Sequence, residues 1–214
     1  MQGFDEKKNS KNIEKNSQTN LSRDEIIKKA FQYQSQGNIA EASKYYQFFI
    51  NRGFKDHRIF LNSGEILKDL GRLEEAEIWI RRAISLKPDY AIAHNNLGNI
   101  LRAKNKLKEA ELCYCRAIIY NPDFIKPYYN LSTLTSTDEN KIWETKLFSE
   151  SFLKNKSKND QFIIFFARSN ILHKRKNYKE SAKYLELANQ LKILIRPSNS
   201  SSLIKKSRSL LIET

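Results

Sequence analysis

The sequence predicts an all-α fold made of stacked helix pairs, and three observations carry this prediction. The 214-residue chain repeats itself at a shift of 34 residues over its central part. Each repeat holds two amphipathic segments, with a Gly or Asn near the middle and a Pro at the end. With 40% apolar and 29% charged residues, the composition is that of one soluble domain or an elongated pair of small ones.

The repeat is defined by seven aligned positions. The shift places Phe60, Gly64, Leu67, Gly71, Ala76, Ala83 and Pro88 on His94, Gly98, Leu101, Asn105, Ala110, Ala117 and Pro122. This pattern resembles the tetratricopeptide repeat (TPR), in which each unit is a helix–turn–helix. The resemblance implies a right-handed α-solenoid over residues 23–192, with about five units at 23–56, 57–90, 91–124, 125–158 and 162–195.

Small residues mark where the two helices of each unit cross. Two antiparallel helices cross closely only where one of them presents no side-chain bulk. In the first helices the position holds Ala30, Gly64, Gly98, Ser132 and, after a three-residue insertion near 154–158, Ser169. In the second helices it holds Ala42, Ala76, Ala110, Glu144 and Ser181. Glu144 departs from the family's Ala and predicts that the second helix of the fourth unit packs loosely or is rotated.

The helix ends follow from local chemistry. Ser22 and Glu25 have the spacing of a capping box, which predicts a helix start there. Gly37, Gly71 and Asn105 suit the left-handed residue that closes a first helix. Pro88 and Pro122 cannot continue a second helix, so each fixes where the next unit begins.

The two ends of the chain differ from the repeats. Residues 1–22 are nearly all polar and are expected to be a disordered tail. Residues 196–214 combine a Pro/Ser loop with a short amphipathic helix, whose apolar residues Leu203, Ile204, Leu210 and Leu211 could cap the array.

The net charge of +14 raises the question of a nucleic-acid or membrane partner. Residues 151–214 contain 14 basic and 4 acidic side chains, so most of the excess lies there. The chain also has 26 Lys and 20 Asn, a bias that an AT-rich coding sequence produces without selection for charge. We therefore expect a solvated Lys-rich face and no dedicated nucleic-acid role. A nucleic-acid interaction through residues 154–192 remains the alternative.

No constellation of catalytic or metal-binding residues appears in the sequence. His57, His94 and His173 lie in different units, and Cys113 and Cys115 point in different directions on a helix. There is no Gly-rich phosphate loop or nucleophile motif. We expect no catalytic, cofactor or metal site and no enzyme activity. The apolar runs are too short for a membrane span or a signal peptide, which favours a cytoplasmic protein, and the oligomeric state stays open.

An Asn ladder is the strongest functional signal. Asn62, Asn96 and Asn130 are spaced 34 residues apart, at a position that faces the concave groove in the resembled fold. An Asn amide can bond both the C=O and the N–H of an extended peptide, whatever its side chains. The ladder resembles that of O-linked N-acetylglucosamine transferases. The alternative is that these amides bond neighbouring helices.

The resemblance also implies which residues flank the ladder. Further groove-facing positions are Glu65, Lys68, Asn95, Asn99, Arg102, Tyr129 and Thr133. Asn95, Asn99 and Arg102 echo part of the clamp by which some TPR domains capture a C-terminal carboxylate, but Glu65 would repel such a group. The sequence thus predicts a scaffold that binds a peptide segment of another protein.

The fifth unit suggests one alternative function. Residues 165–168, 172, 177–178 and 188–192 resemble the last repeat of bacterial TPR–sulfotransferase proteins. This alternative makes the chain the non-catalytic module of a truncated or split enzyme. It predicts a phosphate-binding loop encoded beyond Thr214 or in a neighbouring reading frame.

Overall fold

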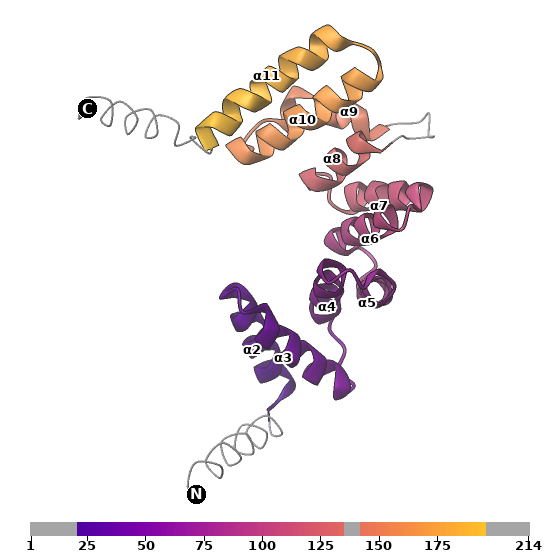
Figure 1. The fold of residues 1–214 in the computed structure, drawn as a ribbon, viewed down its shortest axis with the longest axis vertical. Helices are drawn as coiled ribbons and strands as arrows, with labels where there is room; N and C mark the ends of the chain where they lie inside the picture. Colours follow the sequence, from indigo (N-terminus) through magenta and orange to yellow (C-terminus); the bar gives the residue numbers. More distant parts are fainter. Residues whose placement is uncertain (1–20, 135–141, 196–214) are drawn as a thin grey trace, which may run out of the picture. The chain divides into compact units, whose positions relative to one another are not determined.

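The computed structural model describes residues 21–134 and 142–195, and all regular structure in these ranges is helical (Figure 1). Ten α-helices and one 3-10 helix occur there, without a strand. The predicted all-α fold of helix pairs is therefore confirmed. The chain divides into two compact units, an N-terminal unit of residues 1–104 and a C-terminal unit of residues 105–214.

The N-terminal unit contains two complete helix pairs and one further helix. These are α2 (Arg23–Ser35), α3 (Ile39–Asn51), α4 (His57–Asp69), α5 (Leu73–Leu86) and α6 (Ala91–Ala103). Each helix packs against the next one along the chain, and α4 also packs against α6. The first helices α2 and α4 are followed by turns at which Gly37 and Gly71 have φ of 74° and 77°. Only a residue that tolerates positive φ closes such a turn without strain, as the sequence predicts.

The predicted capping box starts α2. The Ser22 side chain accepts a hydrogen bond from the Glu25 amide at 3.3 Å, and the Glu25 carboxylate accepts one from the Ser22 amide at 2.8 Å. These bonds satisfy two of the backbone donors that a helix start leaves unpaired. The capping bonds hold the pKa of Glu25 below its ordinary value.

Gly64 shows why a small residue is needed where α4 crosses α5. A Cβ atom at this position would lie 2.6 Å from Ile80 Cδ1 and 3.1 Å from the Ala76 carbonyl oxygen. Ala76 and Ile80 on α5 are themselves fully buried. Glycine is therefore used here for close approach and not for turn formation.

The C-terminal unit departs further from a regular array. Its elements are α7 (Leu107–Tyr120), α8 (Ile125–Thr133), α9 (Ile142–Phe148), the 3-10 helix η1 (Glu150–Phe152), α10 (Lys158–Lys174) and α11 (Tyr178–Ile195). α10 begins four residues before the expected start of the fifth unit at 162, because Ser157 caps it by accepting a hydrogen bond from the Asp160 amide at 3.1 Å. The preceding Asn155 has a positive φ of 61° and helps turn the chain within the insertion.

Two basic side chains at the C-terminal end of α10 bond to residues of the short helices α8 and α9. Lys174 donates to the carbonyl oxygens of Ser132, at 2.7 Å, and Leu134, where α8 ends. Arg175 forms an ion pair with Glu144. Glu144, from which loose packing of the second helix of the fourth unit was predicted, is thus buried and ion-paired. It lies in α9, a helix of only seven residues.

Two equivalent residues tie successive helix pairs to the unit-ending prolines. His94 Nε2 lies 2.8 Å from the Pro88 carbonyl oxygen, and the Tyr128 hydroxyl donates to the Pro122 carbonyl oxygen at 2.9 Å. His94 and Tyr128 are 34 residues apart, as are Pro88 and Pro122. His94 is buried, and its bond to Pro88 makes it part of the packing at the start of α6. Burial raises the pKa of the Tyr128 phenol well above its ordinary value.

Several sequence expectations fall outside the described residues. These are the disordered tail up to residue 20, the Pro/Ser loop and the C-terminal amphipathic helix with Leu203, Ile204, Leu210 and Leu211. Among the helices that are described, none is both long and apolar enough to cross a membrane.

Candidate peptide-binding surface

Asn62 lies on α4 and bonds to both helices of the preceding pair. Its Nδ2 donates to Gln34 Oε1 on α2 at 2.8 Å and to the Tyr46 hydroxyl on α3 at 3.1 Å. The Tyr46 hydroxyl in turn donates to Gln34 Oε1. Both amide hydrogens of Asn62 are used in this arrangement, while its Oδ1 accepts no hydrogen bond from the described residues.

Asn96 repeats this lateral bonding one unit later. Its Nδ2 donates to Glu65 Oε1 on α4, and its Oδ1 accepts a weak bond from Asn95 Nδ2 at 3.4 Å. We call the four partly exposed side chains of Gln34, Asn62, Glu65 and Asn96 the amide row. The row runs across the first helices α2, α4 and α6 of the N-terminal unit, and its members are held in place by one another.

Two tyrosine phenols interact electrostatically with members of the amide row. Burial, and then the Glu65 charge, raise the pKa of the Tyr90 phenol on the residue before α6. Burial also raises the pKa of Tyr46, against the lowering effect of its bond from Asn62. Both phenols therefore stay protonated at neutral pH, and Tyr46 keeps its role as a donor within the row.

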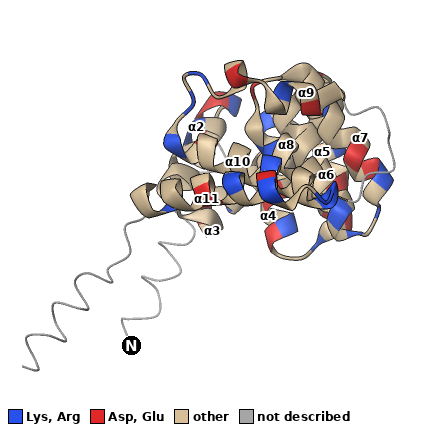
Figure 2. Ribbon diagram, turned by 90° about the horizontal axis from the view of Figure 1, so that it is seen from above, with Lys and Arg blue, Asp and Glu red and all other residues tan. Residues whose placement is uncertain are grey.

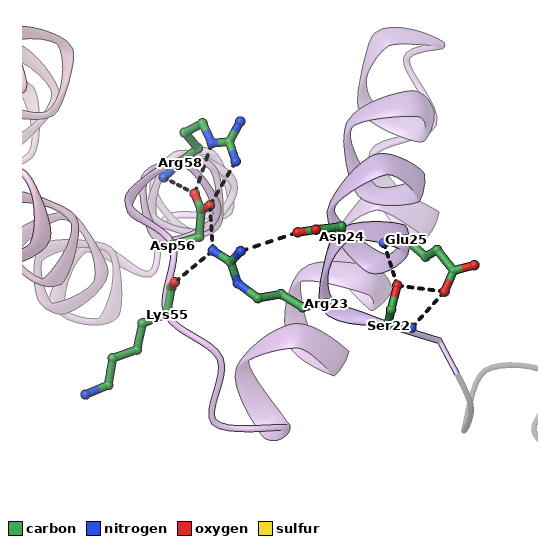
Figure 3. Close-up of polar contacts among 7 residues, drawn as sticks. All are labelled: Ser22, Arg23, Asp24, Glu25, Lys55, Asp56 and Arg58. Carbon is green, nitrogen blue, oxygen red and sulfur yellow. Dashed lines mark hydrogen bonds and ion pairs between the residues drawn. The ribbon is translucent and has the colours of Figure 1, made fainter.

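A buried carboxylate positions α2 against the start of α4 (Figure 3). Asp56 accepts hydrogen bonds from the Arg58 amide at 2.9 Å, from Arg58 Nε at 3.1 Å and from Arg23 Nη2 at 3.4 Å. Arg23 also donates to the Lys55 carbonyl oxygen. Burial alone raises the pKa of Asp56, but the bonds from Arg58 outweigh it and leave this pKa below its ordinary value.

The remaining predicted groove residues fall into two groups. Asn95 is buried, Asn99 is partly buried, Arg102 is exposed, and Lys68 forms an ion pair with Asp69 at 2.9 Å. These four lie in the N-terminal unit with Asn62 and Asn96. Asn130, with 8% exposure, and the exposed Tyr129 and Thr133 lie on α8 in the C-terminal unit.

The C-terminal unit has its own polar pocket of about 430 Å³. Thr133 and Ser132 of α8, Asn170 and Lys174 of α10 and Ser181 of α11 are among its lining residues. Asn170 Nδ2 donates to Ser132 Oγ at 3.2 Å, which ties α10 to α8 beside the pocket.

Two members of the surface were missed by the sequence analysis. Gln34 lies four residues after Ala30, the same offset that places Lys68 after Gly64 and Arg102 after Gly98. The repeat register could therefore have identified it. The Tyr46 hydroxyl bonds to Gln34 and Asn62, and nothing in the repeat pattern indicates that it reaches the row.

Among the described residues, neither the charged side chains nor the potential metal ligands form a second candidate site. Lys and Arg occur together with Asp and Glu on its helices (Figure 2). Some of the basic side chains of the C-terminal unit are paired, such as Lys183 with Glu180 at 2.6 Å. The described residues contain no group of three or more His, Cys, Asp or Glu side chains that could hold a metal ion.

Comparisons with known proteins identify tetratricopeptide repeats in the middle of the chain. The family described as TPR repeat matches residues 64–101, and the one described as tetratricopeptide repeat matches residues 91–124. The comparison with curated proteins finds no match.

Solved structures resemble the fold over most of the chain. A tetratricopeptide repeat protein from Parabacteroides merdae is 20% identical, with 83% of this chain and 68% of that chain covered and a TM-score of 0.61. MamA from Desulfovibrio magneticus RS-1 is 16% identical, with 79% and 94% covered and a TM-score of 0.56. Human IFIT1 is 16% identical, with 76% and 39% covered and a TM-score of 0.58. At such identities the likeness shows the fold alone.

The two family matches together identify residues 64–124 of this chain as tetratricopeptide repeats. Repeats of this class support a role as a protein-interaction scaffold.

Proposed function

We propose that this scaffold binds an extended segment of another protein along the amide row of the N-terminal unit. The observation that carries the proposal is the row itself. Asn62 and Asn96 are partly exposed, lie at equivalent positions of successive repeats and are each held by a bond to the preceding first helix. Side chains fixed in this way lose little further freedom when a ligand binds.

The lateral bonds define how a peptide backbone would be held. Asn62 Oδ1 can accept a peptide N–H without disturbing the row, whereas donation to a peptide carbonyl requires exchange of the bond to Tyr46 or Gln34. Each such contact contributes roughly 0.5–1.5 kcal/mol net. The row therefore gives weak, sequence-tolerant binding, to which neighbouring side chains add affinity and selectivity.

Other predicted residues have supporting roles in this proposal. Asn95, Asn99, Arg102 and Lys68 flank the row in the N-terminal unit. Asn130 and Tyr129 are proposed to contact the partner on the C-terminal unit. Neither a cofactor nor a metal takes part in the proposed function.

Affinity capture with the full chain tests the proposal. The wild type and a variant with Asn62→Ala, Asn96→Ala and Asn130→Ala are immobilised in equal amounts and exposed to the same native lysate. A control variant carries Asn51→Ala, Asn159→Ala and Asn189→Ala, which remove three exposed amides elsewhere.

The expected result is a partner that is retained by wild type and control and reduced at least several-fold on the ladder variant. Circular dichroism checks that helix content is unchanged. Equal retention by all three proteins would refute the role of the Asn ladder.

A further inference from the structure

Glu65 is a carboxylate without a cation partner in the middle of the amide row. It is partly buried on α4 and accepts one hydrogen bond, from Asn96. None of the ion pairs among the described residues involves it. A carboxylate that loses part of its hydration without gaining a cation is less stable than one that is paired, so a matching positive charge would stabilise it.

The nearby basic side chains of α4 are engaged with other acids. Arg58 binds both carboxylate oxygens of Asp56, at 3.1 Å from Nε and 2.9 Å from Nη2. Lys68, one helical turn after Glu65, lies 2.9 Å from Asp69. The cation that would complete the Glu65 site is therefore not supplied by the helix that carries it.

The surroundings of Glu65 also favour a cation over a neutral group. Asn62, one helical turn before Glu65 on α4, has an oxygen that accepts no hydrogen bond from the described residues, and the Glu65 charge contributes to the raised pKa of the Tyr46 and Tyr90 phenols. A carboxylate with an amide oxygen on the same helix face matches the several N–H donors of a Lys or Arg side chain.

We propose that Glu65 selects a Lys or Arg side chain of the bound segment, so that the partner is a basic extended peptide. This inference rests on the proposed function, because it assigns chemistry to a ligand of the same row. The preference is opposite in sign to the capture of a C-terminal carboxylate. An acidic segment placed beside Glu65 would be repelled.

Selection from a random ten-residue peptide library tests the inference with the full chain. The library is selected in parallel on wild type, on Glu65→Gln and on Glu75→Gln. Glu65→Gln keeps an oxygen that accepts the Asn96 bond, so the row is preserved. Glu75→Gln removes an equal charge from an exposed position of α5, where Glu75 pairs with Arg72, and is the control for the change in net charge.

We expect wild type and Glu75→Gln to enrich peptides with Lys or Arg at one fixed position. Glu65→Gln should still enrich peptides but lose that preference. The best peptide and its Lys→Gln or Arg→Gln form are then titrated against wild type and Glu65→Gln. In this double-mutant cycle, removing the cation from the peptide should weaken its binding to wild type about 5–10-fold. The same change should weaken its binding to Glu65→Gln less than twofold.

The outcomes separate the two proposals. Peptides that are enriched by wild type without a basic preference, or a preference that survives Glu65→Gln, overturn the role of Glu65 and leave the scaffold function in place. Failure of wild type to enrich any peptide overturns peptide binding and this inference with it.

Discussion

Arg168 shows how a single residue can replace the packing that the repeat pattern expects. The family usually has Leu at this position, but Arg168 is buried with 3% exposure. Its Nε donates to the Leu147 carbonyl oxygen at 2.8 Å and its Nη2 to the Ser149 carbonyl oxygen at 2.9 Å. The guanidinium also lies over the rings of Phe148 and Tyr184. Arg168 therefore binds the carbonyl groups where the short helix α9 ends.

Replacing Arg168 by Leu, the residue usual at the corresponding position of a tetratricopeptide repeat, should destabilise the protein. Arg168→Leu leaves the Leu147 carbonyl oxygen without this donor and removes the second bond to Ser149, so we expect a loss of about 2–4 kcal/mol in the free energy of unfolding. Arg168→Lys keeps the positive charge but cannot donate to both carbonyl oxygens with the same geometry. Its free energy of unfolding should therefore lie between those of wild type and Arg168→Leu. Urea unfolding of the three proteins measures this order. A Leu variant as stable as wild type would contradict it.

At the scale of elements, the boundaries of the helices are decided by a few polar side chains. Ser22 starts α2, Asp56 starts α4 and Ser157 starts α10, each by accepting a bond from a backbone amide of the first turn. Asp56 also forms an ion pair with Arg23 of α2. One carboxylate therefore both caps α4 and joins it to the preceding helix pair. Its side chain is only 5% exposed, which leaves these bonds weakly screened.

The Asp56 arrangement predicts a specific dependence of stability on pH. Because the folded-state pKa of Asp56 is below the ordinary 3.8, its stabilisation is present above that pH and is lost as pH falls through the folded-state value. Asp56→Asn should lower the free energy of unfolding by about 1–3 kcal/mol at pH 7 and by progressively less as the pH drops below 3.8.

Urea unfolding of wild type and Asp56→Asn at several pH values checks this trend. Asp89→Asn, which removes an exposed carboxylate outside this cluster, is the control for the change in charge. A difference between wild type and Asp56→Asn that stays constant into the acid range would show that the carboxylate charge is not what stabilises this junction.

At the scale of the molecule, the periodic features were predictable and the irregular ones were not. The 34-residue period fixed the small residues at the crossings, and the special backbone at Gly37, Gly71 and Asn105 is confirmed by positive φ values of 74°, 77° and 59°. Such features are local or repeat-wide, so the sequence carries them directly.

The fourth and fifth units illustrate what the repeat pattern could not provide. The Arg175–Glu144 ion pair joins residues 31 apart, and the pattern read Glu144 only as a defect. The crossing of α10 and α11 is held by hydrogen bonds between Ser169 and Ser181, at 3.0 Å between the hydroxyls. Pairings of this kind depend on which side chains meet in space, so a repeat position alone does not specify them.

The candidate site was predictable only in part for the same reason. The ladder register identified Asn62 and Asn96, but the direction of their amides depends on Gln34, Tyr46 and Glu65 of the neighbouring elements. The resemblance of the fifth unit to TPR–sulfotransferase proteins stays a prediction, as does the absence of a nucleic-acid role.

The most direct test of peptide binding is the affinity of one defined peptide for the wild type and for an Asn62→Ala and Asn96→Ala double variant. The peptide is the tightest one selected on the wild type, labelled for fluorescence anisotropy, and both proteins are used as full chains. We expect a Kd at least about fivefold higher for the double variant, equivalent to about 1 kcal/mol, at unchanged helix content. Equal Kd values for the two proteins would contradict it.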